Sequence, residues 1–328
     1  MTAVLFTCAG QRVDIVSAFG RAGAFTVAAD ANPLAPALYH ADRYSLVPRI
    51  DDPDYVPALR RLVDEHDVKL VVPLTDLDQH ILAEADLGAV ALVPDVDVCE
   101  AMADKWRAHE FFLERGVPTP DGWLPRELPP DLSFPVLVKA RVGFGSRNIF
   151  RCDTSDELAF HLRHTPVDSF VQKRCAGEEF SIDVFSDLEA RCLNAIPRTM
   201  IESKGGESIK GMTIKDAELI EFGRHVAETI GIKGPANVQC FREPDGSLLV
   251  TDVNPRFGGG FPLPHAAGGR YPELALALAR GERPEPRLGE FREGVVMTRF
   301  FSQLTLVAGE GGTLEPFSEE LPEPIAEA

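Results

Sequence analysis

Oxygen-bearing side chains and an arginine gather in an expected hairpin near position 250. Asp252 and Asn254 alternate along its second strand, so both face the same side of the sheet. The hairpin turn brings Gln239, on the first strand, opposite that pair. Carboxylate and amide oxygens suit Mg²⁺, a hard cation that keeps several waters and accepts phosphate oxygens. Arg256 follows, where it can pair with a phosphoryl group in transfer. A purely structural polar hairpin leaves this one-sided arrangement on an apolar strand unexplained.

A second group of candidate ligands follows the predicted buried strand Pro135–Ala140. Lys139 lies at the end of that strand, and the loop after it contains Gly143, Gly145, Ser146 and Arg147. Glycines let backbone N–H groups approach an anion closely, while lysine and arginine supply positive charge. The combination favours a polyphosphate, although the loop lacks the GxxxxGK[ST] pattern of a P-loop. Taken alone, a glycine hairpin with solvated charges is an equally good interpretation.

A third group lies in the stretch 171–185, where another strand ends and the next begins. Gln172 and Lys173 end the first strand, Gly177 turns the chain, and Glu179 enters the second. Backbone groups at a strand end can hydrogen-bond an adenine edge, and a carboxylate can accept from ribose hydroxyls. By itself, an ordinary hairpin with exposed charge is the favoured interpretation of this stretch.

The first hundred residues alternate short apolar runs with helical stretches, which predicts a Rossmann-like parallel sheet with helices on its faces. Strands are expected at Ala3–Thr7, Phe25–Ala29, Leu70–Pro73 and Ala89–Val93, and helices at Val13–Ala22 and Pro57–Glu65. Such a sheet holds ligands at its strand ends, here Gly10-Gln11-Arg12 and Thr75-Asp76. Because there is no GxGxxG sequence, a plain turn is the simpler interpretation at Gly10.

The pattern changes near residue 103, where we place a domain boundary. A helix is expected from Lys105 to Arg115, and the following residues up to 304 predict an α+β domain with antiparallel strands. Those strands are Pro135–Ala140, Asn148–Cys152, Ser169–Lys173, Phe180–Ser186, Arg191–Pro197, Ala236–Arg242, Ser247–Val253 and Gly294–Phe301, with helices at Asp216–Ile230 and Tyr271–Ala279. Residues 305–328 are acidic and proline-rich, and we expect a flexible tail there.

Composition narrows the class of partner. The 328 residues carry a formal net charge of −18, which argues against a nucleic acid or an anionic membrane as the main partner. No apolar run reaches the roughly 18 residues that a membrane span needs, and the N-terminus lacks the basic region of a signal peptide. The six cysteines form no CxxC pair or zinc-like cluster, so we expect reduced thiols in a cytoplasmic protein.

Together, the three groups of residues resemble the ATP-grasp superfamily over about residues 104–300. The chain is most similar to the ATP-grasp units of the carbamoyl-phosphate synthase large subunit and its stand-alone relatives, whose NVQ…E-x-NPR pattern resembles NVQ…DVNPR here. The resemblance implies a preATP-grasp domain over residues 1–103, followed by an ATP-grasp fold of two subdomains. The lid subdomain would cover about 104–170 and the C-terminal subdomain about 171–304, with ATP between them.

The resemblance also implies a role for each matching residue. Lys105 and Lys139 match the lysines that contact ATP phosphates, and residues 141–148 match the glycine-rich lid. The adenine and ribose contacts would come from Gln172, Lys173, Cys175 through its backbone, and Glu179. Gln239, Asp252 and Asn254 match the Mg²⁺ ligands, with Mn²⁺ a possible substitute, and Arg256 matches the arginine that stabilises the phosphoryl group. Asp252 departs from the usual Glu, which puts the number of bound ions in doubt.

The segment Pro197–Lys215 concentrates positive charge in an otherwise acidic chain. It holds Arg198, Lys204, Lys210 and Lys215 around glycines, which suggests an anionic substrate or the γ-phosphate as its ligand. The alternative is a mobile loop with solvated lysines. We expect Arg198 to contact the substrate as a second catalytic residue, whereas His265 is more often structural than catalytic in such a position.

The reaction that the resemblance implies is phosphorylation of a small-molecule carboxylate by ATP. An amine or another nucleophile then attacks the acyl phosphate, which releases ADP and phosphate. One alternative is an enzyme like carbamoyl-phosphate synthase that activates bicarbonate or carbamate, as a homodimer or with partner subunits. Another is a nucleotide-binding regulatory protein without turnover, which has little use for Arg256 and three metal ligands.

Overall fold

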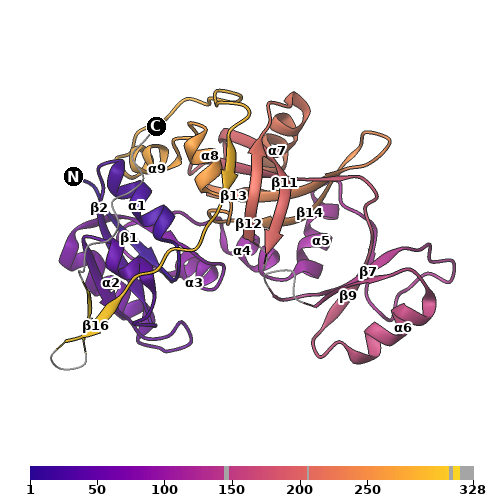
Figure 1. Ribbon diagram of the computed structural model, residues 1–328, viewed down its shortest axis with the longest axis horizontal. Helices are drawn as coiled ribbons and strands as arrows, with labels where there is room; N and C mark the ends of the chain where they lie inside the picture. The colour runs from indigo at the N-terminus through magenta and orange to yellow at the C-terminus, as the bar shows by residue number, and fades with distance from the viewer. Residues whose placement is uncertain (144–147, 205–206, 310–312, 318–328) are drawn as a thin grey trace.

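The computed structural model describes residues 1–143, 148–204, 207–309 and 313–317. These residues form a two-stranded hairpin sheet and three larger sheets, and the larger three follow one another along the long axis of the molecule (Figure 1). A parallel sheet lies at the N-terminal end, a large antiparallel sheet lies in the centre, and a smaller antiparallel sheet with β7 and β9 lies at the far end. The predicted class, a Rossmann-like domain followed by an α+β region of two parts, is confirmed.

The N-terminal sheet has the strand order β3-β2-β1-β4-β5, with all its pairs parallel. Its elements are β1 (Ala3–Thr7), α1 (Val13–Arg21), β2 (Phe25–Asp30), a 3₁₀ turn (Pro36–His40), β3 (Arg43–Leu46), α2 (Tyr55–His66), β4 (Val68–Pro73), α3 (Gln79–Glu84) and β5 (Val90–Ala91). All of β1 is buried, as its apolar sequence predicts for a central strand. The sequence did not predict β3, because this edge strand is polar and mostly exposed.

The central sheet has the order β14-β13-β10-β11-β12-β15. Its strands are β10 (Glu178–Ser186), β11 (Cys192–Lys204), β12 (Glu207–Thr213), β13 (Gly234–Arg242), β14 (Leu248–Asn254) and β15 (Val296–Thr298). Helix α7 (Ala217–Ile230) packs on this sheet, and Asp216 caps its first turn by accepting from two backbone N–H groups. β11 and β12 form a hairpin, so the described part of the segment Pro197–Lys215 is mostly strand and not the mobile loop that was the alternative interpretation.

The smaller sheet has the order β6-β9-β7-β8. It consists of β6 (Gly122–Trp123), β7 (Val136–Ala140), β8 (Ile149–Cys152) and β9 (Ser169–Lys173), with α6 (Ser155–His164) packed against it over a core of its own. The expected lid of about 104–170 differs from this unit in one respect. Helix α5 (Lys105–Glu114), which falls within that range, packs into the core of the central sheet and buries Ala108 and Phe112 there, next to Val98 of the preceding helix α4 (Val96–Ala103).

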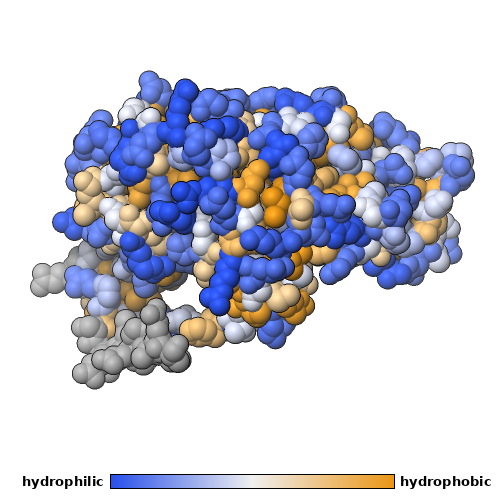
Figure 2. Space-filling model, turned by 90° about the horizontal axis from the view of Figure 1, so that it is seen from above, coloured by the Kyte–Doolittle hydropathy of each residue, from blue (hydrophilic) through white to orange (hydrophobic). Residues whose placement is uncertain are grey.

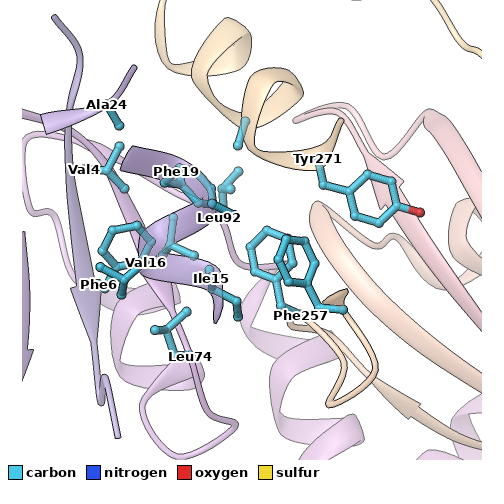
Figure 3. Close-up of a cluster of buried hydrophobic side chains, with 14 of the residues drawn as sticks. Val4, Phe6, Ile15, Val16, Phe19, Ala24, Leu74, Leu92, Phe257 and Tyr271 are labelled. Atoms are coloured by element: carbon cyan, nitrogen blue, oxygen red, sulfur yellow. The ribbon is translucent and has the colours of Figure 1, made fainter. Parts of the chain in front are cut away.

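One hydrophobic core joins the N-terminal sheet to the segment after β14. Figure 3 shows Phe257 beside Ile15 and Phe19 of the first domain, with Tyr271 at the other side of the same buried cluster. The rings of Phe19 and Phe257 meet edge to face, with centroids 6.0 Å apart. Helices α8 (Pro262–Ala266) and α9 (Tyr271–Ala279) complete this core. The first domain is therefore fixed against the residues that follow the proposed metal strand.

The chain after β15 returns to the N-terminal domain, where β16 (Leu306–Ala308) pairs with β17 (Leu314–Pro316) (Figure 1). The Tyr44 hydroxyl donates to the carbonyl of Leu314 at 3.4 Å. This hairpin lies within residues 305–328, where the sequence predicts a flexible tail, and residues 318–328 lie outside the described residues.

The surface agrees with the acidic, polar composition. The face shown in Figure 2 is mostly hydrophilic, with apolar residues in separate patches. Across the described ranges of the chain, no helix has both the length and the apolar character that crossing a membrane requires.

Candidate active site

A pocket lies where the three sheets meet, and most of the predicted phosphate and metal residues line it. The N-terminal domain contributes Asp76, helix α5 contributes Lys105, and the smaller sheet contributes Lys139 and Gly143. The central sheet and the segment after it contribute Ser181, Arg198, Met200, Ser208, Asn237, Gln239, Asp252, Asn254, Arg256, Gly259 and Gly260. Side chains from distant parts of the sequence therefore share one cavity.

The hairpin of β13 and β14 places the three expected metal ligands together. Its register sets Gln239 directly opposite Asp252 and sets Asn237 opposite Asn254. The amide of Asn254 donates to Asp252 Oδ2 at 3.2 Å. These oxygens line the pocket on one face of the hairpin, as the alternation of the sequence predicts.

Asp252 also forms an ion pair with Lys105, whose Nζ lies 2.7 Å from Oδ1. Burial acts to raise the pKa of the Asp252 carboxyl, but the charges of Lys105 and Lys139 and the hydrogen bonds outweigh it, so the pKa lies below its ordinary value. The carboxylate is therefore ionised at neutral pH, which is the form that a divalent cation requires.

Lys105 takes its position from the start of α5. Asp104 caps that helix by accepting from the backbone N–H groups of Trp106 and Arg107. The same carboxylate forms an ion pair with Arg141, just beyond β7, and the backbone N–H of Lys105 donates to the carbonyl of Arg141 at 2.8 Å. These contacts join the N-terminus of α5 to the end of the strand that carries Lys139.

Lys139 is buried beside a phenylalanine ring and a glutamine. Its Nζ donates to Gln172 Oε1 at 3.0 Å and lies 5.8 Å from the ring centroid of Phe170. Burial lowers the pKa of Lys139 to about 8; Asp252 opposes this shift and Lys105 adds to it. A buried ammonium with so few compensating charges is well suited to bind an anion.

Arg256 connects the metal strand to the N-terminal domain. Its guanidinium donates to Asn254 Oδ1 at 3.2 Å and to Asp76 Oδ2 at 3.0 Å. Three further bonds join the same regions: Gln79 donates to the carbonyl of Pro255, and Arg12 donates to the carbonyls of residues 257 and 258. Arg256 is thereby held at the pocket from both sides.

Arg198 lies at the base of the pocket and is only 2% exposed. Its Nε donates to Asp183 Oδ2 at 2.7 Å, and Asn237 donates to the other oxygen of that carboxylate at 3.0 Å. Gly260 lies against the guanidinium so closely that an added Cβ would lie 2.4 Å from Cζ. A glycine at this position therefore lets the backbone lie against the Arg198 side chain, whether or not a ligand also approaches it.

The expected adenine and ribose residues lie along β9 and the start of β10, outside the described lining of the pocket. Gln172 is occupied by its bond to Lys139, and Lys173 is exposed, 3.9 Å from Asp121. Burial raises the pKa of the Cys175 thiol to about 12, so it is neutral. Glu179 is within electrostatic reach of Lys139 and Arg198. Gly143 lines the pocket, whereas the predicted ligands Gly145 and Ser146 lie outside the described residues.

Two other basic residues of the Pro197–Lys215 segment, Lys210 and Lys215, make contacts elsewhere, whereas the side chain of Lys204 lies outside the described part of the structure. Lys210 forms a 2.7 Å ion pair with Glu202, and Lys215 lies 5.7 Å from the ring centroid of Phe291. His265 stacks on Phe261, and burial lowers its pKa, as expected for a structural histidine. Arg198 is thus the cation of this segment that the described residues place at the pocket.

Several pocket residues were not among the predicted ligands. Asn237 belongs to the same NVQ motif as Gln239 and could have been found from the alternation of β13. Asp183 sits beneath the pocket on β10, in the FSIDVF run, where alternation marks it as a polar residue on a buried strand. Ser208 has a buried hydroxyl without a partner among the described residues, and no sequence signal pointed to it.

The donor set fits Mg²⁺ that arrives with a nucleotide better than a resident ion. In the described part of the chain, no three His, Cys, Asp or Glu side chains cluster to hold a metal. The candidate set has one carboxylate, Asp252, and two amides, Gln239 and Asn254. Mg²⁺ is commonly held by one or two carboxylates together with substrate phosphates, so this set is sufficient only with a phosphate ligand.

Comparison with known proteins supports the same division of the chain. The family described as "PylC-like, N-terminal domain" matches residues 4–92, and the family described as "ATP-grasp in the biosynthetic pathway with Ter operon" matches residues 165–300. The carbamoyl phosphate synthase large chain of Thermoanaerobacter sp. (strain X514) is 28% identical over 167 residues. That alignment covers 46% of this chain and 15% of the relative, so this chain corresponds to a small part of that protein.

Solved structures show the fold. The biotin carboxylase domain of 2-oxoglutarate carboxylase from Hydrogenobacter thermophilus aligns with a TM-score of 0.71 and 20% identity, over 90% of this chain and 73% of that one. An L-amino acid ligase from Bacillus licheniformis aligns with a TM-score of 0.67 and 19% identity, over 89% and 78% of the two chains. The resemblance predicted from the motifs is confirmed by these matches.

Proposed function

We propose that this chain, which belongs to the ATP-grasp superfamily, is an ATP-dependent ligase that joins a carboxylate to an amine. In this proposal ATP phosphorylates the carboxylate, and the acyl phosphate is attacked by the amine with release of ADP and phosphate. Relatives with the same fold include a protein named as an amino acid ligase and one named as a carboxylase domain, which are both consistent with carboxylate activation.

One observation carries the proposal: two lysines, three oxygen ligands and an arginine line a single pocket although they come from separate elements. Lys105 and Lys139 are placed to neutralise phosphates, and Arg256 is placed to stabilise the phosphoryl group in transfer. Catalysis of this kind consists mainly of positioning and charge neutralisation, so it does not need a protein nucleophile.

Gln239, Asp252 and Asn254 would hold the Mg²⁺ of the nucleotide, which supplies charge neutralisation at the phosphates when bound. Mn²⁺ takes similar oxygen ligands and is proposed as a substitute. Lys105, whose Nζ lies 2.7 Å from Asp252 Oδ1, would lie beside the metal-bound phosphates and could contact a phosphate oxygen. Arg198 would contact the substrate at the base of the pocket, while Gln172, Lys173, Cys175 and Glu179 would form the adenine and ribose edge.

A second candidate function is activation of bicarbonate or carbamate. It is favoured by the similarity to carbamoyl phosphate synthase large chains and by the bound bicarbonate in the Hydrogenobacter structure. With one ATP-grasp unit in this chain, that activity would need a homodimer or partner subunits. A homodimer is also consistent with the dimeric Hydrogenobacter domain, and we propose the cytoplasm as the location because the thiols are unpaired.

The test is an assay of ADP release by the purified protein with Mg·ATP. A panel of carboxylates is paired with ammonium, methylamine and glycine, and bicarbonate with ammonium is included. The Asp252→Asn variant, purified in the same way, is the control for contaminating ATPases. Release that depends on an organic carboxylate supports the ligase, and release that depends on bicarbonate supports the second candidate. Tight ATP binding without turnover on any pair contradicts both and favours a regulatory nucleotide-binding protein.

A further inference from the structure

Asp76 is a pocket carboxylate that the ATP-binding assignment does not use. It follows β4 at the C-terminal edge of the N-terminal sheet, and its side chain is 39% exposed. The shared core around Phe257 and the bond from Gln79 to the carbonyl of Pro255 bring this edge to the pocket. Asp76 is therefore held at the pocket by the packing of the two domains against each other.

The three carboxylates at the pocket differ in how many hydrogen bonds they accept from protein groups. Asp252 accepts from Lys105 and Asn254, and Asp183 accepts from Arg198 and Asn237 on separate oxygens. Among the described residues, Asp76 accepts one hydrogen bond, from Arg256 to Oδ2, and its buried Oδ1 has no partner. An ionised carboxylate accepts several hydrogen bonds, so Asp76 has acceptor capacity left that the described protein groups do not fill.

The position of Asp76 relative to the reaction follows from Arg256. The same guanidinium contacts the proposed metal ligand Asn254 and the carboxylate of Asp76. A phosphoryl group that Arg256 stabilises, and the acyl carbon attached to it, would therefore form close to Asp76. The second substrate must approach that carbon, and a carboxylate beside it attracts a donor with positive charge.

From this arrangement we propose that Asp76 receives the nucleophile as a primary ammonium group and accepts one of its protons; this inference rests on the proposed ligase function. The resulting neutral amine attacks the acyl carbon. A C–N bond forms and the bond from that carbon to the phosphate oxygen breaks, so phosphate leaves with the bonding electron pair. The second proton on nitrogen leaves with the phosphate, which gives an amide and hydrogen phosphate, and Asp76 returns its proton to solvent.

The experiment compares two nucleophiles with the carboxylate that supports ADP release. Methylamine is a cation at neutral pH, whereas hydroxylamine is neutral there and traps acyl phosphates as hydroxamates. For Asp76→Asn, which keeps an oxygen for Arg256, the KM for methylamine should rise roughly tenfold or more because a charged hydrogen bond is lost. Hydroxamate formation should stay within about threefold of the wild-type rate, since that nucleophile needs no anionic partner. Asp76→Glu should recover part of the methylamine activity.

Asp51→Asn is the matched control, because it removes the same charge from an exposed position of the same domain. It should leave both nucleophiles unaffected. An equal loss with both nucleophiles in Asp76→Asn would overturn the inference and show that Asp76 only positions Arg256. Wild-type protein that forms hydroxamate but uses none of the cationic amines would also overturn it, with the ligase chemistry intact. Wild-type protein without ADP release on any carboxylate would overturn the proposed function and this inference together.

Discussion

Binding of ATP should take up a proton at alkaline pH, and that proton should reside on Lys139. The side chain is buried and its pKa is lowered to about 8 in the protein without nucleotide. Phosphate oxygens placed beside Nζ would favour the charged form and raise its pKa again. Above about pH 8 the free protein must therefore regain a proton before it can bind, and the affinity should fall as the pH rises.

The size of the effect follows from the two pKa values. If phosphates restore the pKa of Lys139 to its reference value of about 10.4, the dissociation constant for ATP should rise roughly tenfold between about pH 7 and about pH 9. Proton uptake should be about half a proton at pH ~8 and about 0.9 at pH ~9. Cys175, whose pKa is raised to about 12, does not titrate in this range.

Calorimetry in buffers of different ionisation enthalpy measures the protons taken up directly, because the observed heat changes with the buffer. The matched control is Lys139→Met, which removes the titrating group and retains an unbranched side chain of similar length. In this variant ATP should bind more weakly, and both the proton uptake and the pH dependence between about pH 7 and 9 should disappear. A wild-type affinity that is flat over this range, or an uptake that persists in the variant, would refute the assignment of Lys139 to the phosphates.

Three substitutions test the rest of the pocket. Asp252→Asn should remove the dependence of ATP affinity on Mg²⁺ in paired titrations with and without the ion; an unchanged dependence would mean that the ion is held elsewhere. Gly260→Ala should lower the melting temperature and the turnover, because its Cβ would overlap Arg198; we expect the free energy of unfolding to fall by about 1–3 kcal/mol. The control is Gly20→Ala in helix α1, where an added Cβ would have no contact closer than 4.0 Å. That substitution should leave the free energy of unfolding unchanged or raise it by up to about 1 kcal/mol. Arg198→Lys retains a partner for buried Asp183, so it should reduce turnover and leave the ATP dissociation constant within about twofold; equal loss of both would place Arg198 in the nucleotide site.

Alternation along two strands was enough to predict that the three proposed metal ligands line the same pocket. Asp252 and Asn254 are two residues apart on one strand, and the hairpin turn fixes which residues of the partner strand face them. The observed pairing of Gln239 with Asp252 needed no information beyond this local pattern. The apolar runs of the first domain were equally informative, because a strand buried on both faces is apolar throughout.

Local patterns failed where strands are polar or where contacts join distant segments. Strand β12 has a mostly polar sequence with one lysine and one glycine, so a mobile loop was left open as one interpretation of this segment, yet the strand pairs with β11 and β15. Helix α5 was assigned to the lid from its place in the chain, but Ala108 and Phe112 bury it against the central sheet. The secondary-structure propensities of these residues predict neither the strand pairing of β12 nor the packing of α5, because both depend on which surface is available after the sheets have formed.

The N-terminal domain is therefore part of the active site and not only its neighbour. Arg256 would be free to turn toward solvent if only β14 held it, since its bond to Asn254 is a single contact 3.2 Å long. The bond to Asp76 and the packing of Phe257 in the first domain's core restrict both ends of this segment. A phosphoryl-stabilising group is effective when it is held in place before the reaction, because no free energy is then spent on reorienting it. The Rossmann-like domain supplies that restraint, and in the proposed ligase reaction its Asp76 carboxylate would lie where the second substrate enters.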